Sequence, residues 1–254
     1  MDELSITAIA VSVCDDASYR PATLLDEGHE FRQLARGLAQ HAGTTLEAVR
    51  IRPAEERAPD VSSLALAALG PRHRDEPLFL VRSGPLSDPH GALLARLVFE
   101  SGWEGEDLGI THLDELGGTL VFGLLSWAVR EGAGATALIC DDPLFADDGA
   151  EELGRWRVAG AALRVRRGAG ALRVLGCGEG VPTAPSDHAE HQLHGSRPAD
   201  GWIALRDAVT QRRVSDGDRV LIHTRGRLRE GWLLLEATDI TALELVTADT
   251  SGTA

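Results

Sequence analysis

Basic side chains are outnumbered in this chain, which has 25 Lys and Arg residues against 39 Asp and Glu residues. The formal net charge is −14 at pH 7, and the isoelectric point is near 5.0. Because DNA and RNA binding relies on cationic side chains that neutralise phosphates, this balance argues against a nucleic-acid partner. A solvated, soluble surface explains the charge, and an acidic face that meets a basic partner is the sharper alternative.

Cysteine and long apolar runs are scarce as well. Cys14, Cys140 and Cys177 lack metal-binding spacing, their odd number argues against a disulfide framework, and their apolar surroundings predict buried, unreactive thiols. No apolar run reaches transmembrane length, and the start MDELSITAIAVSV lacks the basic region and cleavage site of a signal peptide. We therefore expect a cytoplasmic protein. No G-x-G-x-x-G opens a helix after the first strand, so no cofactor is expected.

The 254 residues, 43% of them hydrophobic, suffice for a full core in one domain or two smaller halves. Strand and helix patterns alternate over the first 140 residues, which predicts a layered, mostly parallel α/β sheet. The helix at 27–41 should bury a stripe of Phe31, Leu34 and Leu38. The other expected elements are strands at 4–13, 49–52, 78–81, 109–113 and 135–140, and helices at 60–69, 92–101 and from Thr119.

Residues 107–148 are the segment around which the other elements are arranged. They are typical of a strand, a tight turn, a buried helix, a second strand and an acidic loop. A strand that runs through a sharp turn into a buried helix is where many α/β enzymes carry a nucleophile. Here the turn is Glu115, Leu116, Gly117 and Gly118, with neither serine nor cysteine.

The sequence LDELGGTLVFGLLSWAVREGAGATALICDD resembles the nucleophile segment of the thiolase superfamily, specifically its β-ketoacyl synthase III-like branch. IRPAEERAPDVSSLALAAL and LFLVRSGPLSDPHGALLARLVFESG are similar to the elements that precede that segment in the family. The family's acyl-accepting cysteine would fall at Leu116 or Gly117. The resemblance implies a thiolase-like layered α/β fold, with an acyl pocket at Leu116, Gly117 and Gly118.

Two predicted hairpins resemble those that close the two halves of the thiolase fold. One joins 158–166 to 171–175 through RGAG, and the other is GDRVLIHTRGRLREGWLLLEA. Between them we expect only a polar linker and a helix at 202–214, where the family has further elements that carry its catalytic His and Asn. His223 does not match that histidine. The resemblance therefore implies a near-complete N-terminal half (1–178), a polar linker (179–200) and a reduced remnant of the C-terminal half (201–254).

A ketosynthase needs a thiolate for the acyl chain and polar donors for the enolate, and the resemblance implies that all three groups are missing. It thus implies a non-catalytic subunit that pairs, as chain-length factors do, with a catalytic ketosynthase in polyketide or fatty acyl-derived specialised metabolism. Family dimers join through the strand before the nucleophile, so the expected contact with the ketosynthase, or with a second copy, is Gly109, Ile110, Thr111, His112 and Leu113. An acyl carrier protein is another implied partner. Because such carriers are acidic, it would need a local basic patch, for which the candidates are Arg164, Arg166, Arg167 and Arg173.

Several alternatives remain open. Glu115 or His112 could act as an acid or base in an acyltransferase or decarboxylase, although a carboxylate paired with an arginine explains Glu115 as well. A free-standing acyl-binding or regulatory module is the third possibility.

Two sets of side chains could hold a metal. His188, His191 and His194 could approach one ion if their segment were helical, but the flanking prolines favour a solvated linker. The acidic residues of the loop could coordinate a cation or simply form a turn and a helix N-cap; they are Asp141, Asp142, Asp147 and Asp148.

Overall fold

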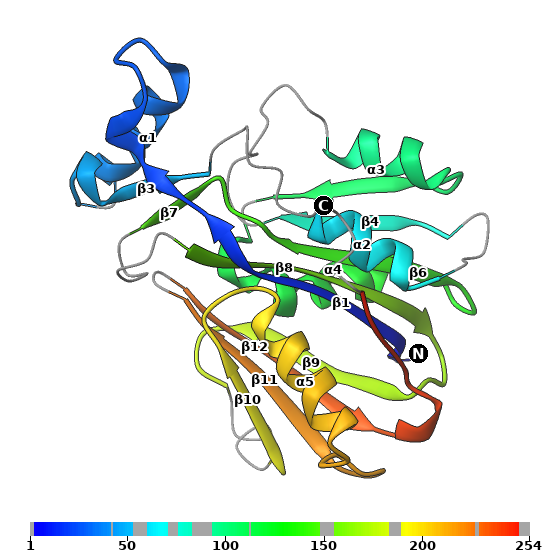
Figure 1. The fold of residues 1–254 in the computed structure, drawn as a ribbon. Coiled ribbons are helices and arrows are strands. Elements are labelled where there is room, and N and C mark those ends of the chain that lie inside the picture. The colour runs from blue at the N-terminus through cyan, green and yellow to red at the C-terminus, as the bar shows by residue number, and fades with distance from the viewer. Residues whose placement is uncertain are drawn as a thin grey trace.

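The computed structural model describes residues 3–41, 43–52, 60–70, 76–82, 93–111, 113–147, 155–182, 189–226 and 229–248. These residues form an α/β structure with a ten-stranded mixed sheet and a three-stranded sheet at one end (Figure 1). In spatial order the large sheet contains β10 (His191–Gly195), β11 (Arg219–Arg225), β12 (Glu230–Ala237), β9 (Leu172–Glu179), β1 (Leu4–Ser18), β8 (Arg155–Arg167), β6 (Gly134–Asp141), β4 (Leu78–Arg82) and β5 (Asp107–Ile110), while β13 (Glu244–Thr247) pairs with β1. The small sheet contains β2 (Arg20–Pro21), β3 (Val49–Ile51) and β7 (Phe145–Asp147).

The helices cover both faces of the large sheet. One face packs against α2 (Val61–Ala68) and α3 (Leu93–Ser101), and the other against α4 (Gly117–Ala128) and α5 (Asp200–Thr210). Successive residues of β1 alternate between the two cores, since Ile9 belongs to the α4 side and Ala10 to the α2 side. The other helical elements are α1 (Glu30–His41) and the short turns η1 (Ala22–Leu24), η2 (Leu46–Ala48), η3 (Asp114–Leu116) and η4 (Ile240–Ala242).

The sheet is mixed, which corrects the expectation of a mostly parallel one. Strands β4, β5 and β6 are parallel to one another, but β8 runs antiparallel to both β6 and β1. The predicted hairpin between 158–166 and 171–175 is wrong, because β1 lies between β8 and β9. Ile6 pairs with Val165 on one side and Leu172 on the other. Most of β1 from Leu4 to Val11 is buried, which suits a strand at the centre of a sheet.

Strand β1 also continues beyond its predicted end at residue 13. Cys14 pairs with Val158 and Ala17 with Trp156, and the register shifts between these two pairs. A bulge of this kind accommodates the two consecutive aspartates, Asp15 and Asp16, within the strand. The strand therefore ends at Ser18, five residues later than predicted.

Helix α1 lies with its short strands in a lobe beside the large sheet (Figure 1). The predicted apolar stripe is wrong in part: Ala35 and Ala39 are the fully buried residues, Phe31 and Leu38 are half-buried, and Leu34 is 43% exposed. The alanines pack with Ala22 and Val49 in a small separate core. Small side chains allow the helix backbone to approach these partners closely, so the larger residues flank the contact.

Three further expectations concern local elements. The predicted helix at 60–69 is confirmed together with its cap, since the Asp60 carboxylate accepts hydrogen bonds from the backbone N–H groups of Ser62 and Ser63, both at 3.1 Å. The hairpin β11–β12 is confirmed as well. The polar linker expected at 179–200 contains a strand that was not predicted, β10, which pairs in parallel with β11. None of the helices in the described ranges is long and apolar enough to cross a membrane.

Candidate functional site

The start of helix α4 is the position where the resemblance to the thiolase superfamily places a nucleophile and where this sequence has neither serine nor cysteine. The helix begins at Gly117, two residues earlier than predicted, directly after the short turn η3. Asp114 has a φ of 46°, a left-handed conformation that is uncommon outside glycine, so the chain bends sharply before the helix. Leu116, Gly117 and Gly118 are all buried.

The space beside Gly117 and Gly118 is filled by other parts of the chain. A Cβ atom added at Gly118 would overlap the carbonyl oxygen of Pro198 and lie 3.2 Å from Nε1 of Trp202. One added at Gly117 would lie 2.8 Å from Cγ1 of Val81. The indole N–H of Trp202 donates a hydrogen bond of 3.0 Å to the Gly118 carbonyl oxygen. An acyl pocket at Leu116, Gly117 and Gly118 stays a prediction, and it would require Pro198 and Trp202 to move.

Glu115 lies against the loop that joins β11 and β12. Its Cβ atom is 2.7 Å from the place where a Cβ of Gly226 would be, so the two residues are in close contact. Arg229, in the same loop, is bound by both carboxylate oxygens of Glu179 at 2.9 and 3.0 Å. These bonds, with smaller contributions from Asp114 and Glu115, raise the pKa of Arg229. The proximity of Arg229 favours the interpretation of Glu115 as an arginine-paired carboxylate. His112, the other candidate acid or base, lies outside the described residues.

The three cysteines do not replace the missing thiol. The Sγ atom of Cys140 is 2.8 Å from Oγ of Ser62, and burial raises the pKa of the Cys140 thiol to about 12. Burial also raises the pKa of Cys177, which packs beneath α4 near Gly123. Cys14 lies in β1 and is half-buried. Since the thiolate is the nucleophilic form, Cys140 and Cys177 are poorly suited to accept an acyl group.

A buried ionic network at the carboxyl end of β6 holds the turn that covers α4. Asp141 is 3% exposed, and its carboxylate accepts a hydrogen bond of 2.8 Å from Arg197. The Asp200 carboxylate accepts from the backbone N–H groups of Ser196 and Arg197 at 3.0 and 3.1 Å, and it also pairs with Arg157. Residues 196–200, including Pro198, are thereby fixed over the first turn of the helix.

This network is not evident from the sequence, because its partners are distant along the chain. The sequence indicates the aspartates of the acidic loop only as possible cation ligands or turn residues, and Arg197 lies in the expected linker. Asp142 pairs with Arg52 instead. The side chain of Asp147 and the whole of Asp148 lie outside the described structure.

Asp141 gives a testable pH dependence. Burial raises its pKa from 3.8 to about 6, although Arg197 opposes the shift. The folded protein therefore holds a proton that the unfolded chain has lost between pH 4 and pH 6. In this window we expect wild-type stability to fall relative to Asp141→Asn, which does not titrate, by about 1.4 kcal/mol per pH unit as the pH rises.

Urea unfolding of both proteins at several pH values would measure this difference. Above pH 7 the difference should level off, because Asp141 is then ionised in both states. A difference that stays constant from pH 4 to pH 7, or that changes in the opposite direction, would contradict a raised pKa.

The histidines of the expected linker do not come together. His191 and His194 lie in strand β10, where residues three apart point to opposite faces, so the helical arrangement that a shared metal required is absent. His191 Nε2 is 3.0 Å from a carboxylate oxygen of Asp218, while the ring of His194 lies 5.5 Å from that of His223. His188 lies outside the described residues, and among the residues that the structure describes no group of three or more His, Cys, Asp and Glu side chains could hold a metal ion.

Comparison with known proteins identifies the fold. No family model matches the sequence, and no curated protein matches it. Among solved structures, the acyltransferase ChlB3 is similar, with 12% identity and a TM-score of 0.59, over 93% of this chain and 98% of that one. PksG, an HMG-CoA synthase from Bacillus subtilis, has 11% identity and a TM-score of 0.60, over 95% and 81%. The HMG synthase of the curacin biosynthetic pathway, in complex with holo donor-ACP, has 9% identity and a TM-score of 0.56, over 94% and 82%.

These likenesses, together with the mixed sheet and its helical layers, show that the chain has the thiolase-like layered α/β fold. The fold class predicted from the sequence is confirmed. At identities this low the likeness shows the fold alone, so the reduction of the C-terminal half and the loss of catalytic groups stay predictions.

Proposed function

We propose that this chain is a cytoplasmic, non-catalytic ketosynthase III-like subunit that pairs with a catalytic ketosynthase, as chain-length factors do, in polyketide or fatty acyl-derived specialised metabolism. The observation that carries the proposal is the closed packing at the start of α4. Neither Leu116 nor Gly117 provides a thiol, and Pro198 and Trp202 occupy the space next to Gly118. An acyl group would have no acceptor at this position, and it would have room only if Pro198 and Trp202 moved.

The position of His223 also supports catalytic silence. Its neighbours in β11, Val220 and Ile222, point into the core shared with α4, so the imidazole of His223 lies on the opposite face of the sheet. There its Nε2 atom is 2.7 Å from the Glu230 carboxylate. A histidine on that face is poorly placed to assist chemistry at α4. In this proposal 1–178 is the near-complete half and 201–254 the remnant, joined through 179–200.

The proposed partner surface is the edge strand β5. In the described sheet this strand pairs with β4 alone, and its residues 107–109 are exposed. Leu108 is 52% exposed, and Phe99 on the neighbouring helix α3 is 87% exposed. An open strand edge with apolar side chains is suited to pairing with another sheet. The predicted strand at 109–113 is corrected to Asp107–Ile110, so it ends before Leu113.

Co-expression with a catalytic ketosynthase tests this surface. We expect a 1:1 complex, and we expect Leu108→Asp to weaken it about tenfold or more, because an exposed apolar contact becomes a charge that must be desolvated. Leu24→Asp is the matched control, since Leu24 is exposed in the lobe of α1, away from β5, and its substitution should leave the complex unchanged. Dissociation constants from surface plasmon resonance would compare the three proteins. A complex insensitive to Leu108→Asp, or a strictly monomeric protein, would contradict the proposal.

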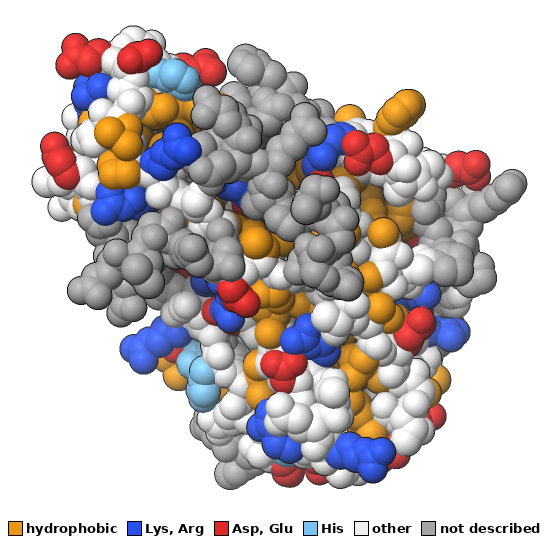
Figure 2. Space-filling view, viewed as in Figure 1, with side chains coloured by type: hydrophobic (Ala, Val, Ile, Leu, Met, Phe, Trp, Pro, Cys, Tyr) orange, Lys and Arg blue, Asp and Glu red, His pale blue; other side chains and the backbone are white. Residues whose placement is uncertain are grey.

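An acyl carrier protein is the second proposed partner, and the curacin HMG synthase supports it because that neighbour was solved with a holo donor-ACP. The four candidate arginines give it limited support. Arg173 pairs with Glu236 and Glu3, Arg167 donates to the Val129 carbonyl oxygen, and Arg166 is exposed. On the side of the molecule that Figure 2 shows, basic and acidic side chains are interspersed over the described residues. We therefore propose that any contact with an acidic carrier is made mainly through the catalytic partner.

A further inference from the structure

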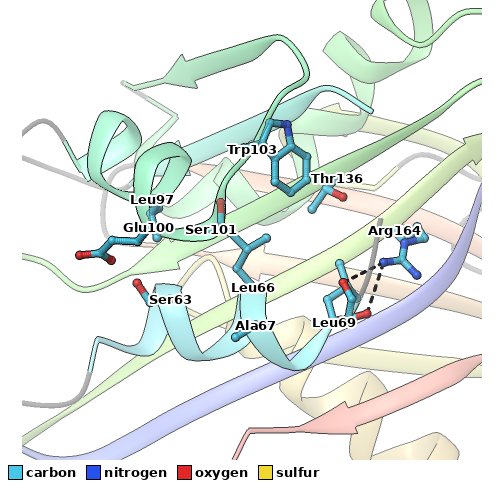
Figure 3. A pocket seen from close by; sticks show the side chains of 11 residues that line it. Ser63, Leu66, Ala67, Leu69, Leu97, Glu100, Ser101, Trp103, Thr136 and Arg164 are labelled. Atoms are coloured by element: carbon cyan, nitrogen blue, oxygen red, sulfur yellow. Dashed lines mark hydrogen bonds between the residues drawn. The ribbon is translucent and has the colours of Figure 1, made fainter. Parts of the chain in front are cut away.

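A cavity of about 320 Å³ lies between helices α2 and α3, on the face of the sheet opposite α4 (Figure 3). Its walls are apolar, with Leu66, Leu69, Leu97 and Trp103 among the lining residues. Trp103 is held in place because its indole N–H donates to the Glu76 carbonyl oxygen at 2.9 Å. The volume is within the range of roughly 300–1,000 Å³ that is typical of small-molecule pockets.

One end of this cavity is polar. Thr136 of β6 and Arg164 of β8 are directly opposite each other in the antiparallel pair, so their side chains lie next to each other on the same face. Arg164 Nη2 donates to the carbonyl oxygens of Leu69 and Gly70 at 3.3 and 3.5 Å, which places the guanidinium at the end of α2. Figure 3 shows Ser63 and the Glu100 carboxylate at the other end of the cavity.

The hydroxyl of Thr136 indicates what this end would bind. The residue is 1% exposed, and its Oγ1 atom has no hydrogen-bond partner among the described residues. Burying a hydroxyl without a partner is unfavourable, so a ligand that brings an acceptor to it would be favoured. The acceptor that also suits an adjacent guanidinium is a carboxylate, because charge-assisted hydrogen bonds are the stronger ones.

Glu76 is the other charge near this end. Its side chain is buried against Gly134, two residues before Thr136 in β6, and it is not among the residues that line the cavity. Glu100 does line it, but from the end opposite Arg164. Of the charged residues that line the cavity, Arg164 is therefore the one beside Thr136.

We propose that this cavity binds a small monocarboxylic acid. Its apolar chain would lie among Leu66, Leu97 and Trp103, and its carboxylate would accept hydrogen bonds from the Thr136 hydroxyl and the Arg164 guanidinium. The site is separated from the start of α4 by the sheet, so the inference goes beyond the proposed partner role and does not depend on it.

Calorimetric titration with straight-chain carboxylic acids from butanoic to dodecanoic acid tests the proposal. We expect saturable binding with an optimum chain length, and affinity about tenfold lower for Thr136→Val, which keeps the shape but removes the hydroxyl donor. The primary amide of the best acid should also bind at least tenfold more weakly, because it brings no charge to Arg164.

Ala67→Trp provides a second, independent variant. Ala67 is exposed and lines the cavity, so a tryptophan there should block it without disturbing the core, and binding should be lost. Ala128→Trp places the same side chain at an exposed alanine of α4 and should bind as the wild type does. The proposal is overturned if no acid binds saturably, if Ala67→Trp binds unchanged, or if the amide binds as well as the acid.

Discussion

Replacing Gly118 with alanine is expected to destabilise the protein by about 3 kcal/mol, because the methyl group has no space. The atom it would overlap is the backbone carbonyl oxygen of Pro198, which cannot turn aside as a flexible side chain could. Moving Pro198 would in turn disturb the hydrogen bonds that Asp200 accepts from the N–H groups of Ser196 and Arg197. Urea unfolding followed by circular dichroism would measure the loss.

Gly123→Ala is the matched control in the same helix. A Cβ atom there would lie 3.7 Å from Sγ of Cys177, an ordinary contact distance. Because alanine is the better helix former, we expect this variant to be as stable as the wild type or more stable by up to about 1 kcal/mol. Equal destabilisation by Gly118→Ala and Gly123→Ala would mean that the start of α4 is not closely packed.

Trp202→Ala is expected to have the second large effect, a loss of about 3–5 kcal/mol. Trp202 is fully buried and packs on Phe122 with ring centroids 5.5 Å apart, so its removal would leave a cavity between α5 and α4. Trp202→Phe retains most of the ring but loses the hydrogen bond to the Gly118 carbonyl oxygen, so a loss of about 1–3 kcal/mol is expected.

Trp127→Ala is the control that shows whether the loss of stability in Trp202→Ala comes from the burial of the side chain or from removing any tryptophan. Trp127 lies at the exposed end of α4 and is 78% accessible to solvent, so we expect its removal to change stability by no more than about 0.5 kcal/mol. Thermal and urea unfolding of the three tryptophan variants would rank them. If Trp202→Ala were as mild as Trp127→Ala, α5 would not be an integral part of the fold.

Local patterns predicted the elements whose determinants are close together in the sequence. The cap of α2 depends on Asp60 and the two residues that follow Val61, and the buried run of β6 is recognisable from its own residues. The hairpin β11–β12 needs only a short turn between two apolar runs. In each case one segment carries enough information to fix its own structure.

Predictions failed where the decisive contacts are distant. The residues around RGAG are compatible with a direct hairpin, and only the insertion of Ile6 between Val165 and Leu172 excludes one. Strand β10 has a polar composition, and its pairing with β11 gives it its structure. Helix α1 likewise takes its buried face from partners outside the helix, so periodicity alone missed Ala35 and Ala39 and wrongly included Leu34.

The candidate site likewise has features that follow from neighbouring residues and features that depend on distant contacts. The absence of a nucleophile between Glu115 and Gly118 is evident from the sequence. The closed packing is not, because Gly118 meets Pro198 eighty positions later along the chain. Nor does sequence spacing link Asp141 to Arg197, which together hold the covering turn. Contacts of this kind depend on the completed fold.

The central claim is that no acyl chemistry takes place at the start of α4. Intact-mass spectrometry of the purified chain, after incubation with acyl-thioesters, tests it most directly, with Glu115→Ala treated in parallel. We predict that neither protein gains the mass of an acyl group and that neither consumes the thioester. An acyl adduct, or thioester turnover that is present in the wild type and lost in Glu115→Ala, would contradict the claim and favour an acyltransferase or decarboxylase that uses Glu115.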